Sequence, residues 1–192
     1  MRPTIKLTLH HKTSWTLFNP RVFDKNTNQV CLIIVILGLY SVYRTREFGK
    51  HEKLKEYAKA TIEGLVKKTD DDFLRKIADF KSTVDSMLED LEDIEFEEIE
   101  QPQMFKIEGK YSNDLSGMII KGIRDFDKIM RNLDKLLFVH EINKDEHRKM
   151  KTELIKIARS YIDFMIKSTK SFETNRKAAE KKLEDLLNKE AS

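Results

Sequence analysis

The segment from Arg2 to Lys12, "RPTIKLTLHHK", alternates strictly between polar and apolar side chains. In an extended strand successive side chains point to opposite faces, so this alternation predicts a strand with one apolar and one polar face. The apolar positions are Ile5, Leu7 and Leu9, and the polar positions are Thr4, Lys6, Thr8 and His10. Hydroxyl, ammonium and imidazole groups at every second position can donate or accept hydrogen bonds along one line. Their chemistry suits recognition of a polar partner.

A strand near the N-terminus needs a partner for its backbone groups. Three partners are open: the later "FKIE" segment, the other extended segment near Ile94, or a second copy of the same strand. The last option carries a function, because two strands paired about a two-fold axis form a ribbon that fits the major groove of DNA. Base edges would then be contacted by Thr4, Lys6, Thr8 and His10, and phosphates by Arg2, Lys12 and Arg21. The alternative is an ordinary strand that caps a helical core.

Catalytic and metal-binding patterns are absent from the sequence. We find no nucleotide-binding glycine motif, no zinc-protease motif and no nucleophile elbow. The single cysteine, Cys31, can form neither an intrachain disulfide nor a cysteine-based zinc cluster. We therefore expect no enzyme activity, no catalytic residue, no metal, no cofactor and no small-molecule substrate.

Charge is segregated along the chain, although the formal net charge is only +3. Residues 1–68 contain 13 Lys and Arg against 5 Asp and Glu, a net of +8. Residues 69–100 contain 3 against 13, a net of −10, and residues 101–192 contain 20 against 15, a net of +5. A basic N-terminal third suits a phosphate-binding or anionic-lipid-binding surface, and the acidic middle must then point away from it or neutralise a partner. The alternative is two solvated helix faces of opposite sign.

The most apolar stretch runs from Val30 to Tyr43 and has 14 residues. Spanning a bilayer takes about 20 apolar residues, so this stretch predicts a buried helix and not a membrane anchor. We expect it to pack against helices near residues 73–91 and 115–165, or at a dimer interface. A cytoplasmic protein without a membrane partner is the resulting prediction.

Helical periodicity covers most of the rest of the chain. Expected helices cover a short piece near residues 13–18, residues 51–68, a helix opened by Thr69 or Asp70, an antiparallel pair built on 115–136 and 150–164, and an amphipathic tail. The period is lost between residues 94 and 110, which predicts short extended segments or a hairpin. The fold class is mainly α: a helical bundle with an N-terminal strand and a short extended or hairpin segment near residues 94–110. Residues 1–50 form the candidate DNA-binding and dimerisation region, and the helical region 51–192 forms one compact domain with it.

Three segments in this order resemble the AcaB-like family of conjugative plasmids and integrating conjugative elements. They are "IKLTLHHKTSWTLFNPR", "DDDFLRKIADFKSTVDSMLEDL" and the stretch from "SNDLSGMIIKGIRDFDKIM" through "INKDEHRKMKTELIKIARSYIDF". The resemblance implies a homodimeric transcriptional regulator with a ribbon-helix-helix type DNA-binding element that binds double-stranded DNA. The alternative is a non-enzymatic helical scaffold or a membrane-associated component of a conjugation apparatus.

Overall fold

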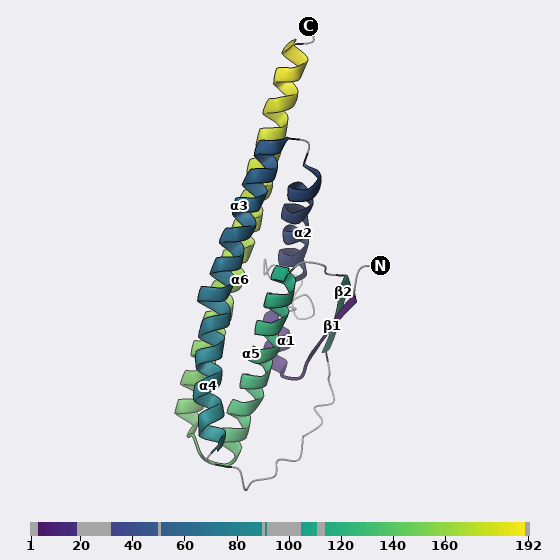
Figure 1. Ribbon diagram of the computed structural model, residues 1–192. Helices are drawn as coiled ribbons and strands as arrows, with labels where there is room; N and C mark the ends of the chain where they lie inside the picture. Colours follow the sequence, from purple (N-terminus) through teal and green to yellow (C-terminus); the bar gives the residue numbers. More distant parts are fainter. Residues whose placement is uncertain are drawn as a thin grey trace.

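The computed structural model describes residues 4–18, 32–49, 51–89, 91, 105–110 and 114–190. The described chain is mainly α-helical, as the sequence predicts, and it carries a two-stranded sheet on one side (Figure 1). The elements are β1 (Thr4–Leu9), α1 (Lys12–Phe18), α2 (Leu32–Phe48), α3 (Glu52–Lys68), η2 (Thr69–Leu74), α4 (Arg75–Glu89), β2 (Phe105–Lys110), α5 (Asp114–Phe138) and α6 (Lys144–Glu190).

Helices α3 and α4 form one continuous rod, joined by the π-helical turn η2, and this rod runs beside α6 (Figure 1). The expectation of a new helix start at Thr69 or Asp70 is therefore wrong, because the backbone of Thr69 is helical with φ −64° and ψ −43°. Acidic residues are tolerated inside the rod because they pair one turn away with cations, as Asp71 does with Arg75 at 3.0 Å. Thr69 instead hydrogen-bonds within the rod, donating to the carbonyl of Leu65 at 2.8 Å.

The expected antiparallel pair is formed by α5 and α6, joined by a tight turn. The turn contains His140, which adopts a left-handed backbone with φ 61°. Asn143 caps α6: its side-chain oxygen accepts the backbone N–H groups of Asp145 and Glu146, both at 2.9 Å. The carboxylate of Glu146 returns a bond to the backbone N–H of Asn143 at 2.9 Å, which completes a reciprocal capping box.

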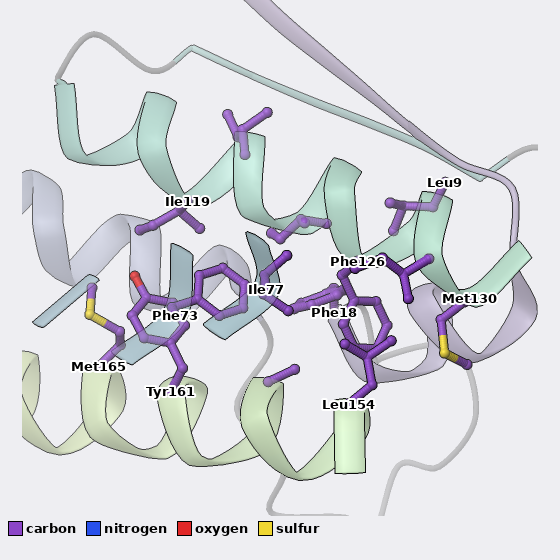
Figure 2. Packing of buried hydrophobic residues seen from close by; sticks show 14 of the residues in the cluster. Leu9, Phe18, Phe73, Ile77, Ile119, Phe126, Met130, Leu154, Tyr161 and Met165 are labelled. Carbon is purple, nitrogen blue, oxygen red and sulfur yellow. The ribbon is translucent and has the colours of Figure 1, made fainter. Parts of the chain in front are cut away.

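The core takes its residues from apolar positions at helical spacing, completely as the sequence predicts in α5 and only in part in α4 and α6. The expected apolar stripe of α5 is buried at every position: Leu115, Ile119, Gly122, Phe126, Ile129, Leu133 and Leu136. The turn η2 adds Phe73 to the core, and α4 adds Ile77 and Val84. Figure 2 shows the rings of Phe73 and Tyr161 beside one another, and their centroids are 4.3 Å apart with the planes 2° from parallel. Burial raises the pKa of Tyr161 far above its usual value, and its hydrogen bond with Thr69 opposes this only in part.

The apolar helix α2 packs along one side of the bundle, with Leu39 in the main core and Tyr40 exposed, and its neighbours differ in part from those expected. It lies against α3 and the far part of α6, where Val42 joins Ala58, Ile62 and Phe172 in a small second cluster. The short connection between α2 and α3 makes the two helices neighbours, and its Gly49 backbone N–H bonds the Thr45 carbonyl at 2.9 Å. None of the helices in the described ranges has the length and apolar character that crossing a bilayer requires.

Candidate nucleic-acid interface

Strand β1 pairs with β2 in an antiparallel two-stranded sheet, the ribbon of this protein (Figure 1). The partner of β1 is thus the "FKIE" segment, one of the three that the sequence leaves open, and the ribbon is formed within one chain. The expectation of two copies of β1 paired with each other is not what this structure shows. The register explains the choice, because Leu7 lies opposite Ile107 and Leu9 opposite Phe105, which puts apolar positions together.

The opposite face of the ribbon holds the polar positions. Directly opposed residues of an antiparallel pair share a face, so the register assembles three pairs there: Thr4 with Lys110, Lys6 with Glu108 and Thr8 with Lys106. The positions from β2 add two lysines and one glutamate to the face predicted from β1. The sequence did not identify Lys106 and Lys110 as candidates. The face on which they lie is known only once the register between β1 and β2 is known.

A single carboxylate attaches the end of the ribbon to the bundle. Asp127 of α5 is buried and accepts the backbone N–H of His10 at 3.0 and 3.2 Å and that of His11 at 2.9 Å. Beside it, Leu9 is fully buried and enters the core near Phe126 and Met130, as Figure 2 shows. The point where β1 turns into α1 is therefore held by one charged acceptor and one apolar anchor.

The neighbouring His11 is buried and hydrogen-bonds to other parts of the fold. Its ring Nδ1 accepts the backbone N–H of Thr13 at 3.0 Å, so Nε2 carries the proton that is donated to Asp134 at 2.9 Å. His147 of α6 reaches the other oxygen of Asp134, also at 2.9 Å. Burial of Asp134 opposes its ionisation, but the hydrogen bonds from the two histidines and the nearby Lys151 outweigh it and lower its pKa to about 2.

Among the residues predicted to contact bases, Thr8 and His10 are partly exposed, and Thr4 and Lys6 occupy the polar positions of β1. Lys12, predicted to contact phosphate, is exposed at the first residue of α1, next to the carboxylate anchor. The other two predicted phosphate contacts, Arg2 and Arg21, lie outside the described residues. The structure thus brings the described candidates to one side of α5, along the ribbon and the start of α1.

The architecture defines a mainly α bundle that carries a two-stranded ribbon beside one helix. No family model matches the chain, and no curated protein matches it. Among solved structures, the crystal structure of selenomethionine-containing AcaB from uropathogenic E. coli is similar, with a TM-score of 0.65 and 14% identity. The likeness covers 96% of this chain and 88% of that one. An AcaB-like fold is therefore confirmed.

Proposed function

We propose that this protein is a DNA-binding transcriptional regulator of genes on a conjugative mobile element, and that it acts in the cytoplasm as a homodimer. The observation that carries the proposal is the amphipathic ribbon. Its apolar face is anchored on the bundle through Leu9, and its polar face presents the positions of Lys6, Lys106 and Lys110. The segments that resemble the AcaB-like family support the regulatory role, and the likeness to AcaB supports the fold alone.

A two-stranded ribbon fits the major groove, where lysine can donate to the O6 and N7 acceptors of guanine. Lys6 occupies the middle position of the polar face, opposite Glu108, and we assign it to a base edge. Thr4, Thr8 and His10 are then assigned to flanking bases. Lys12 lies beyond the end of the strand, and with Arg2 and Arg21 it is assigned to phosphates.

Base contacts and phosphate contacts respond differently to substitution, and this difference tests the proposal. Lys6→Ala should cost about 1–3 kcal/mol at a specific site and relax the preference at one base position. Lys12→Ala should weaken binding to all sequences and lower the salt slope by about one. The control is Lys149→Ala, which removes an exposed lysine from α6 and should leave both quantities unchanged.

The measurement is a salt-dependent titration of each variant against duplexes from the upstream regions of its own mobile element and against an unrelated duplex. Salt-sensitive binding by the intact protein, with the two responses above, supports the proposal. If the intact protein binds no DNA, or if the two ribbon-side variants behave like the α6 control, the proposal fails. The helical-scaffold alternative would then be preferred.

A further inference from the structure

Helix α5 carries all of its cations on one face. Its Lys and Arg residues recur at spacings of three, four, three and four, which keeps side chains aligned along a helix. They are Lys121, Arg124, Lys128, Arg131 and Lys135, here called the α5 basic stripe. With a rise of 1.5 Å per residue, the stripe is about 21 Å long, with a cation every 5 Å or so.

One acidic residue of α5, Asp114, is exposed seven positions before Lys121 and so shares this face at the start of the helix, while the other three lie beside the stripe. Asp127 is buried under the ribbon, Asp134 faces the two histidines, and Asp125 lies near Lys81 of α4. In contrast, Lys121, Arg124 and Lys128 are exposed, and none of them forms an ion pair with any residue in the described part of the chain. A neutral solvated face would mix both signs, as α6 does with Glu153 and Asp163 among its exposed cations.

The α5 basic stripe adjoins the ribbon. Its Arg131 lies 3.7 Å from the Asp127 carboxylate, the same group that holds the backbone of His10. Lys12 follows two residues later at the start of α1, which also packs against α5. The α5 basic stripe therefore passes close to the point where the ribbon joins α1, and its Arg131 is paired with the carboxylate that holds this point.

We infer that the α5 basic stripe binds the sugar–phosphate backbone of double-stranded DNA beside the groove that the ribbon enters. Within the stripe, Lys121, Arg124 and Lys128 are exposed over about 10 Å of helix, while Arg131 is paired with Asp127. Such a line of cations matches a regularly charged polyanion, whereas a single small anion would engage only one or two of them. The inference rests on the proposed function, because it assigns to the same DNA a second contact surface. Its contribution is independent of sequence, since phosphates are the same at every base pair.

The test compares two triple variants with the same change in charge. One is Lys121→Gln, Arg124→Gln and Lys128→Gln on α5, and the control is Lys149→Gln, Lys156→Gln and Arg159→Gln on exposed positions of α6. Gln is a good helix former, so both triples should fold, and circular dichroism with a thermal melt checks this. Binding of each variant to a specific and to an unrelated duplex is then measured from about 0.05 to 0.3 M salt.

The α5 triple should lower the magnitude of the salt slope by about 0.9 for each lost phosphate contact, or about 2.7 in all. Affinity for both duplexes should fall by the same factor, roughly tenfold or more near 0.1 M salt, while the α6 triple changes little. Equal effects of the two triples would overturn the inference, because the α5 basic stripe would then act only through the net charge of the protein. Tighter binding of the intact protein to polyglutamate than to a duplex of equal charge would overturn the assignment to DNA.

The two proposals fail separately. If Lys6→Ala alters base preference and the α5 triple matches its control, the ribbon reads DNA without the α5 basic stripe. If the α5 triple acts as expected and the ribbon variants are silent, the stripe binds DNA and the ribbon does not read it. Absence of any DNA binding by the intact protein removes both.

Discussion

At the scale of single residues, Asp127 has the most demanding position in the described part of the molecule. It links three elements, because it belongs to α5 and binds the backbone of His10 and His11, the two residues between β1 and α1. Buried backbone N–H groups are costly to leave without an acceptor, and a charged acceptor makes the strongest such bonds. The carboxylate of Asp127 therefore fixes the angle at which the ribbon leaves the bundle.

Asp127→Asn should lower the free energy of unfolding by about 1.5–3 kcal/mol, since the charged acceptor becomes a neutral amide. The matched control is Asp125→Asn, two residues earlier on α5. This position is partly exposed, and the change should alter stability by less than about 0.5 kcal/mol. Urea denaturation of both variants gives the comparison. A similar loss in the two variants, or no loss at Asp127, would show that the ribbon is held by packing alone.

The importance of Asp127 could not be predicted from the sequence, although the pair Asp125 and Asp127 is visible in it. The bonds join residues 116 and 117 positions apart, and neither partner carries a local pattern that points to the other. The same holds for the shared carboxylate of Asp134, which joins His11 to His147. In contrast, the alternation of β1 is local, and its buried Leu9 and partly exposed Thr8 follow it.

At the scale of elements, periodicity predicted the helices well and their boundaries less well. The stripe of α5 is buried as expected because a 3.6-residue period depends only on the chain itself. The expected helix start at Thr69 or Asp70 was wrong because a run of Asp residues favours a helix N-terminus but also supports ion pairs inside a helix. The pairing of β1 with β2 joins residues about a hundred positions apart, and the sequence alone left three possible partners for β1 open.

Contact between α5 and the rod depends on Gly122, which lets Phe73 approach closely. A Cβ atom at Gly122 would lie 2.3 Å from Cε1 of Phe73, and this ring is confined on its other side by Tyr161. Gly122→Ala should therefore lower the free energy of unfolding, because overpacking costs about 1–3 kcal/mol and outweighs the gain in helix propensity of up to about 1 kcal/mol. Thermal and urea unfolding measure the difference.

The control for this substitution is Gly64→Ala in α3, where an added Cβ meets nothing within 4 Å. That variant should be more stable than the parent by about 0.5–1 kcal/mol, the usual preference for alanine in a helix. Opposite signs at the two glycines are expected. Stabilisation at both would mean that Phe73 moves freely and that the close approach of α5 to the rod is not required.

At the scale of the whole molecule, the segregated charge gives the protein an orientation toward a polyanion. The proposed basic surface is formed by the ribbon, the start of α1 and α5, which precede and follow the acidic residues 69–100 in the sequence. An approaching duplex is attracted by this basic surface and repelled by the acidic residues 69–100. A homodimer would present two such surfaces, and sedimentation of the intact protein tests that proposal directly.

The acidic middle should therefore act against DNA binding or be neutral to it. Three of its carboxylates, Glu95, Glu97 and Glu98, lie outside the described residues, and their neutralisation to Gln should leave DNA affinity unchanged or raise it. Long-range repulsion is screened beyond about 10 Å at 0.1 M salt, so any gain should be larger at low salt and should fade as salt is added. The control neutralises Glu56, Glu63 and Glu153, which are exposed on α3 and α6 and give the same change in net charge. A marked loss of affinity in the first triple and none in the control would place the acidic segment at the DNA surface, where carboxylates contact bases, and would contradict the orientation proposed here.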